Sequence, residues 1–329
     1  MTQKVMETAK NIFAIPKLSP KIEQERRASV FGMVESGKTT ILGLLEIVCV
    51  DYANKENRPG KKPKFHYLVQ ERSSGIRQAA AELRKGMFPE KTPARLFEAH
   101  FLMRFARTFG EQRIRLPFCE TGGEVFTKLL NRFQKGMYDI TPAMEDAKLI
   151  KDYILDTDAL ILITPTPRGL GLEDDIGATL NLPDVNLARL CAGIYEYKML
   201  DAKSGNPGHR PIRGIAVFLT KYDAVQDFCE AKQMPLDTPQ GVHAFMSKCF
   251  PETYAVLGWY GLENVRFWPT GVEIETQRNE VTGQIEPKRH PLNPSRGWKI
   301  KENKNLNKPI FTEPPFYEFI EWLKNTVMA

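Results

Sequence analysis

Short apolar segments alternate with longer segments of helical periodicity along most of the chain. An apolar run of roughly four to eight residues is typical of a parallel strand that is buried on both faces. Strands are predicted at residues 28–34, 158–164, 214–219 and 263–268. Because helical segments separate these strands, the pattern predicts an α/β domain with a mostly parallel sheet.

A β-hairpin is predicted between the first two of these strands. The odd-numbered positions from 97 to 105 are apolar, with polar residues at several even positions, and residues 112–119 alternate in the same way. Alternation of this kind indicates strands with one buried face. Residues 65–69 are a short strand candidate.

Eight segments have the composition or spacing of helices. They are residues 40–50, 73–87, 125–137, 143–155, 185–200, 238–250, 251–259 and 316–327. The last of them carries an apolar stripe at helical spacing, which predicts that the C-terminal helix packs on the sheet. We therefore expect a mostly parallel six-stranded sheet with one antiparallel strand and helices on both faces.

Composition limits the classes of protein to which the chain can belong. Its 329 residues are 26% charged and 42% hydrophobic, and no apolar run is long enough to span a membrane, which is typical of a soluble protein. We expect a cytoplasmic location. The five cysteines lack C-x-x-C spacing, so neither a zinc site nor a disulfide framework is indicated.

The predicted elements define one enlarged domain. We expect an N-terminal arm over residues 1–27 and a single domain over 28–329, with insertions at about 52–91, 165–209 and 277–310. The insertion at 277–310 is rich in Lys and Arg, which leaves a solvated or protein-binding loop, an anionic surface and nucleic acid as alternatives. A single tryptophan there, Trp298, is too little for base stacking, so the loop is favoured.

The turn after the first strand carries the main chemical signal. Gly32 to Thr39 fits G-x-x-x-x-G-K-[ST], the P-loop pattern, in which backbone N–H groups converge on phosphates. Lys38 would face the β and γ phosphates, and Thr39 would offer a hydroxyl to Mg²⁺. The residues expected to bind phosphate are Gly32, Glu35, Ser36, Gly37, Lys38, Thr39 and Thr40. The alternative is a glycine turn with an incidental lysine.

Two further motifs follow predicted strands in the expected order. Glu120 ends one strand and Gly123 follows three residues later, giving E-x-x-G, while Thr220-Lys221-Tyr222-Asp223 gives T-K-x-D after a later strand. With the P-loop, this order resembles that of the Ras-like, translation-factor-related GTPases. Within that class the chain resembles the bacterial double-GTPase group of conflict and defence gene neighbourhoods. The resemblance covers residues 28–327 and implies the P-loop GTPase fold.

The resemblance also implies roles for individual residues. Magnesium would be held by Thr39, Thr92 and Glu120, with Glu120 replacing the usual aspartate. Gly123 would meet the γ phosphate. Guanine would be selected by Thr220, Lys221 and Asp223, because a carboxylate accepts hydrogen bonds from guanine that adenine cannot donate. Further along, the final base-contacting loop would contain Thr270 and Gly271.

Glu124 stands where these GTPases often have the glutamine that orients the attacking water. It would act as a base or repel the γ phosphate, which predicts slow hydrolysis or dependence on a partner. An equally good alternative is a glutamate favoured by a helix N-terminus.

The expected function is a GTP-binding molecular switch with Mg²⁺, GTP and GDP as ligands, weak GTPase activity and a protein partner. A non-hydrolysing GTP-bound scaffold subunit and an ATP-dependent kinase remain as alternatives. The kinase would need a lid of phosphate-binding arginines, which the sequence does not reveal.

Overall fold

The computed structural model describes most of the predicted domain. The described residues are 24–32, 36–71, 75–90, 97–107, 110–120, 131, 135, 156–166, 182–205, 209–221, 225–280, 282–291 and 298–327. The helices predicted at 125–137 and 143–155 and nearly all of the arm at 1–27 lie outside these ranges.

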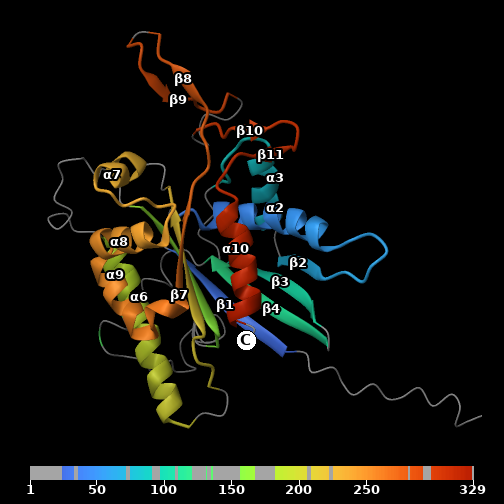
Figure 1. Ribbon diagram of the computed structural model, residues 1–329, viewed down its shortest axis with the longest axis vertical. Coiled ribbons are helices and arrows are strands. Elements are labelled where there is room, and N and C mark those ends of the chain that lie inside the picture. The colour runs from blue at the N-terminus through green and yellow to red at the C-terminus, as the bar shows by residue number, and fades with distance from the viewer. Residues whose placement is uncertain are drawn as a thin grey trace, which may run out of the picture.

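One large sheet forms the centre of the structure (Figure 1). In spatial order its seven strands are β2 (Phe65–Glu71), β3 (Phe97–Arg107), β4 (Gly110–Glu120), β1 (Gln24–Gly32), β5 (Ala159–Pro165), β6 (Gly214–Thr220) and β7 (Val265–Thr270). Only β3 runs against its neighbours, β2 and β4, whereas β4, β1, β5, β6 and β7 pair in parallel. The predicted class, a mostly parallel sheet with one antiparallel strand, is confirmed.

The sheet has seven strands, whereas six are expected from the sequence, and the additional strand is β2. The segment predicted as part of an insertion supplies β2, which pairs with β3 from Phe65↔Phe105 to Glu71↔Ala99 and forms one edge of the sheet. Its inward residues Phe65 and Val69 are buried and the alternate residues are exposed, as an edge strand covered on one face requires.

Helices cover both faces of the sheet. One face carries α2 (Lys38–Glu56), α3 (Gly75–Arg84) and α10 (Pro314–Trp322), which continues as the π-helical turn η7 (Leu323–Val327). The other face carries α6 (Leu182–Lys203), α7 (Gln226–Ala231), α8 (Pro239–Cys249) and α9 (Pro251–Leu257), followed by the short 3₁₀ turns η4 (Gly258–Tyr260) and η5 (Leu262–Asn264). Among the described helices, none is long and apolar enough to cross a membrane.

Burial on both faces explains the continuous apolar runs in β5 and β6. Leu160 and Leu162 belong to the core beneath α6 and α8, whereas Ile161 and Ile163 belong to the core beneath α2 and α10. Because successive side chains point to opposite faces, every position of such a strand must be apolar. Each buried aliphatic side chain contributes about 1.5–3 kcal/mol.

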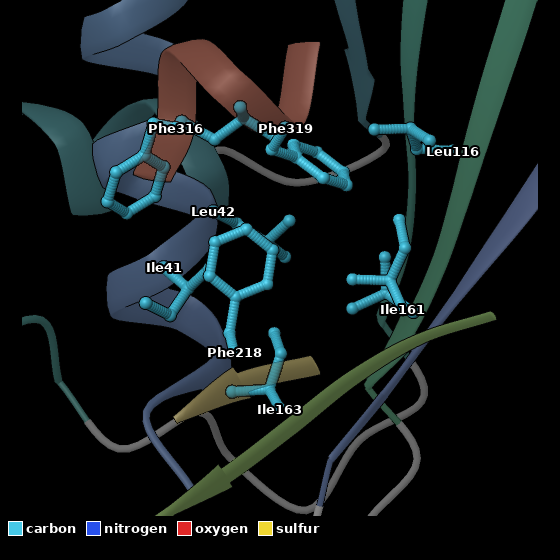
Figure 2. Close-up of a pocket in the computed structure, with 10 residues that line it drawn as sticks. Ile41, Leu42, Leu116, Ile161, Ile163, Phe218, Phe316 and Phe319 are labelled. Atoms are coloured by element: carbon cyan, nitrogen blue, oxygen red, sulfur yellow. The ribbon is translucent and has the colours of Figure 1, made fainter. Parts of the chain in front are cut away.

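The core beneath α10 and α2 is tightly filled. Figure 2 shows Phe316 and Phe319 extending from α10, with Phe218 of β6 lying between α2 and β5. These groups surround an apolar cavity of about 10 Å³. An apolar cavity of this size leaves the packing close to complete beneath α2.

Pro117 lies in the middle of β4, although proline lacks the N–H that a central strand needs. The strand accommodates it by pairing with β3 at His100↔Pro117 and omitting a stretch of its ladder with β1. That ladder runs from Gln24↔Gln112 to Arg27↔Arg115 and resumes only at Val30↔Phe118. The interruption lies opposite the missing donor.

A buried ionic cluster lies at the end of the sheet where β5 begins. The Asp158 carboxylate, with its side chain 1% exposed, accepts hydrogen bonds from Arg26 Nη1 at 3.3 Å and Arg210 Nη1 at 3.1 Å. It also accepts one from the backbone N–H of Arg27 at 2.9 Å. Lys198 Nζ donates to the Thr157 and Arg210 carbonyls, and its burial lowers its pKa to about 8. These hydrogen bonds hold the start of β5 to β1 and α6.

Residues 271–312, here called the ribbon, connect β7 to α10. The ribbon contains β8 (Thr276–Arg278), β9 (Ile285–Pro287), β10 (Glu302–Asn303) and β11 (Lys308–Pro309), and the β8–β9 hairpin projects from the body (Figure 1). Its lysines are largely paired: Lys299 with Glu275 at 2.6 Å, Lys301 with Glu273 at 3.0 Å. Such pairing offsets the charge of these two lysines.

The ribbon docks on the turn that follows α3. Ile300, which is fully buried, donates its N–H to the Gly86 carbonyl at 2.9 Å. Gly86 has φ +70°, and a Cβ added there would lie 3.0 Å from the Ile300 carbonyl oxygen. A residue without a side chain is required at this contact.

Gly86→Ala should destabilise the fold, and Gly60→Ala provides its control. Gly60 has φ +73° but no atom within 4 Å of an added Cβ, so alanine there should cost only the left-handed backbone, about 1–2 kcal/mol. At Gly86 the contact with the ribbon should add at least about 1 kcal/mol. Urea unfolding of both variants measures the difference. If both variants lose the same free energy of unfolding, the contact between the ribbon and this turn does not restrict the residue at position 86.

Candidate functional site

The phosphate loop lies at the C-terminal end of β1 and leads directly into α2. Gly37 is the N-cap of α2 with φ +83°, a left-handed conformation that glycine adopts without strain. The first helical hydrogen bond runs from Ile41 N to Gly37 O at 2.9 Å. At this end of α2 the helix dipole favours an anion.

Gly32 is required by close packing inside the loop. A Cβ at Gly32 would lie 2.6 Å from Ser36 Oγ and 2.8 Å from the Ile163 carbonyl oxygen. Lys38 reaches back across the loop and donates from Nζ to Gly32 O at 2.9 Å. Ser36 is fully buried, and its Oγ has no hydrogen-bond partner among the described residues. A buried hydroxyl without a partner is uncommon in a folded protein.

Thr220, the first residue of the T-K-x-D motif, braces the phosphate loop. Its Oγ1 donates to the Ser36 carbonyl at 2.8 Å, and its side chain is the nearest group to Gly37. Thr220 is 5% exposed, so this hydrogen bond is shielded from water. The structure thus joins the two motifs directly, while a role for Thr220 in selecting guanine stays a prediction.

Lys221 follows with an unusual backbone conformation. Its φ is +61°, which is rare for a residue with a side chain and costs about 1–3 kcal/mol unless neighbouring contacts enforce it. Thr166 supplies such contacts: its Oγ1 donates to the Lys221 carbonyl at 2.8 Å, and its N–H donates to the Thr220 carbonyl at 2.9 Å. The strained residue is held by the strand end beside it.

Thr270 and Gly271 lie at the same edge of the sheet. Thr270 ends β7 and pairs in register with Thr220 at the end of β6. Gly271 accepts a hydrogen bond from the N–H of Thr312 at 3.1 Å, which closes the base of the ribbon. The structure therefore brings the predicted final loop next to the T-K-x-D segment.

The predicted magnesium ligands are only partly described. Thr39 lies in the first turn of α2, and Glu120 is the last residue of β4. Because Val30 pairs with Phe118, the ends of β1 and β4 lie side by side, which brings the Glu120 backbone near the phosphate loop. In the described part of the chain, no three His, Cys, Asp or Glu side chains gather into a metal site. Glu35, Thr92, Gly123, Glu124 and Asp223 lie outside the described residues.

The bracing hydrogen bonds were not predicted from the sequence. Thr166 carries no motif signal, since it is one of several threonines in Thr164-Pro165-Thr166. Only the pairing of β5 with β6, which ends at Pro165↔Thr220, brings it to Lys221.

The strand, the glycine loop and the helix together define a P-loop α/β domain. No protein-family model matches the chain, and no curated protein sequence matches it. Among solved structures, it is similar to the GTPase-like domain of S. cerevisiae Ski7 bound to GTP, with 12% identity and a TM-score of 0.30 over 75% of this chain and 42% of that one. It is also similar to Sup35 complexed with GMPPNP, with 12% identity and a TM-score of 0.31 over 80% of this chain and 41% of that one.

A third similar structure is the signal recognition particle receptor SRb-GTP/SRX complex from Chaetomium thermophilum, with 9% identity and a TM-score of 0.30 over 74% of this chain and 93% of that one. The chain spans only about two fifths of the Ski7 and Sup35 chains. At these levels of similarity, the site is defined by the chain's own residues.

Thr220→Val should weaken the loop because it leaves the Ser36 carbonyl buried without its donor. We expect a loss of about 1–3 kcal/mol in the free energy of unfolding, whereas Thr220→Ser should stay within about 1 kcal/mol of the native protein. Urea unfolding compares the two variants. If valine and serine give the same stability, the hydrogen bond does not brace the loop.

Proposed function

We propose that the protein is a GTP-binding molecular switch that hydrolyses GTP slowly or under the control of a partner. The observation that carries this proposal is the hydrogen bond from Thr220 Oγ1 to the Ser36 carbonyl. It joins a loop suited to phosphates with a T-K-x-D segment suited to guanine.

Guanine recognition would depend on Lys221 and Asp223. The Asp223 carboxylate would accept hydrogen bonds from guanine N1–H and its 2-amino group, and the Lys221 stem would lie along the base. Adenine offers neither donor in that arrangement and would leave the carboxylate unpaired, which discriminates strongly. Thr270 and Gly271 would contribute a backbone N–H to the guanine O6 from the adjacent strand end.

The phosphates would bind over the N-terminus of α2, with Glu35, Thr40 and Ser36 completing the loop around Lys38. Mg²⁺ would neutralise charge between the β and γ phosphates when bound. Thr39, Thr92 and Glu120 would hold it. The places of Thr39 at the helix start and of Glu120 at the adjacent strand end are compatible with that role.

Slow hydrolysis would follow from the charge of Glu124 if it faces the γ phosphate. Glu124 would place a carboxylate where a neutral side chain orients water more easily, and Gly123 would contact the γ phosphate from its N–H. Release of the segments around Thr92 and Gly123 after hydrolysis would make the switch. If Glu124 abolishes hydrolysis, the protein is instead a GTP-bound scaffold subunit, the second candidate.

The wider proposals follow from the same resemblance. We propose a cytoplasmic protein of the bacterial double-GTPase group that acts on a protein partner. We also propose a single domain over residues 28–329, because β1 near one end and α10 near the other share one core.

Asp223→Asn tests the guanine assignment. Removing the carboxylate should lower GTP affinity roughly 10-fold or more and reduce the preference for GTP over ATP, because a charged hydrogen bond contributes about 1.5–3 kcal/mol. Equilibrium binding of both nucleotides measures this. Asp237→Asn is the control, since Asp237 is exposed and outside the motif. Unchanged affinity and preference in Asp223→Asn would refute guanine recognition.

A further inference from the structure

Thr166 lies directly after β5 and contacts the first two residues of the T-K-x-D segment. It is 2% exposed, so its polar groups are shielded from water. Its hydroxyl donates to the Lys221 carbonyl at 2.8 Å and its N–H donates to the Thr220 carbonyl at 2.9 Å. Two consecutive peptide groups are thus fixed by one residue.

These contacts begin where the sheet stops. The register of β5 with β6 ends at Pro165↔Thr220, so no further ladder constrains the chain after Thr220 on this side. At Lys221 the chain turns through a left-handed conformation with φ +61°. The Thr166 hydroxyl replaces the missing ladder bond at this turn, and it therefore fixes the position of the Lys221 carbonyl.

We propose that Thr166 is a positioning residue for base recognition, which sets the preference of the site for guanine without touching the base. The proposal rests on the proposed function, since it concerns the same T-K-x-D segment. Thr166 acts through Lys221: with the hydroxyl present, the Lys221 carbonyl is held and the left-handed turn is enforced. Without it, the segment relaxes toward ordinary backbone conformations and the base-reading groups lose their alignment.

A merely structural threonine offers the necessary comparison. Thr253 of α9 is fully buried, and its Oγ1 donates to the Asp184 carbonyl at 2.9 Å, much as Thr166 Oγ1 donates to Lys221. Thr253 contacts α6 through this hydrogen bond, and it belongs to neither the P-loop nor the T-K-x-D segment. Its valine variant reports what the loss of one buried hydroxyl does to the fold alone.

The experiment measures equilibrium binding of GDP, IDP and ADP to the native protein and to Thr166→Val, Thr166→Ser and Thr253→Val. IDP lacks the 2-amino group of guanine, and ADP tests the phosphate contribution. We expect Thr166→Val to lower GDP affinity roughly threefold to tenfold, the loss expected for one hydrogen bond, with ADP affinity unchanged. Its preference for GDP over both other nucleotides should fall accordingly. Serine should restore the native values, and Thr253→Val should change only the melting temperature.

Other outcomes overturn the inference. It is wrong if Thr166→Val keeps the native GDP-to-ADP and GDP-to-IDP ratios, or if GDP and ADP affinities fall together as they would from a general loss of structure. Thr166→Ala also removes the hydroxyl and gives the same test if valine prevents folding. A native protein that does not prefer GDP over ADP refutes the proposed function itself, a result separate from any effect of Thr166.

Discussion

Burial of β1, β5 and β6 on both faces is the constraint on which the structure depends. The parallel strands of this sheet are covered by helices on both sides, and because they are parallel their C-terminal ends meet at one edge. The loops after β1, β6 and β7 consequently converge there, although they are separated by more than half of the chain. At the other end, the Asp158 cluster fixes the strand starts. The site is a product of this parallel arrangement.

Threonine hydroxyls connect these converging loops. Thr220 holds the carbonyl of Ser36 in the phosphate loop, and Thr166 holds that of Lys221 in the T-K-x-D segment. Both hydroxyls lie in a water-excluded edge, where a hydrogen bond is stronger and a missing partner costs more. Two buried hydrogen bonds thereby connect the described parts of the proposed nucleotide site.

The sequence predicted what depends on local pattern and missed what depends on tertiary contact. The apolar runs of β5 and β6, the loop at Gly37 and the final helix stripe were visible because each follows from periodicity or backbone conformation. β2 was only weakly predicted, since an edge strand covered on one face has a short pattern. Pro117 lacks the N–H that a central strand needs, but its position opposite a gap in the β1 ladder removes the conflict. Thr166 could not be recognised, because its partner is distant in sequence.

The central claim is that the edge of the sheet formed by β1, β5, β6 and β7 binds a guanine nucleotide. The most direct test is to purify the protein without added nucleotide, release whatever small molecule is bound by denaturation, and identify it by chromatography. The account predicts GDP or GTP in near-equal molar ratio to protein, and a surviving γ phosphate would indicate slow hydrolysis. An adenine nucleotide at that stoichiometry would contradict the account.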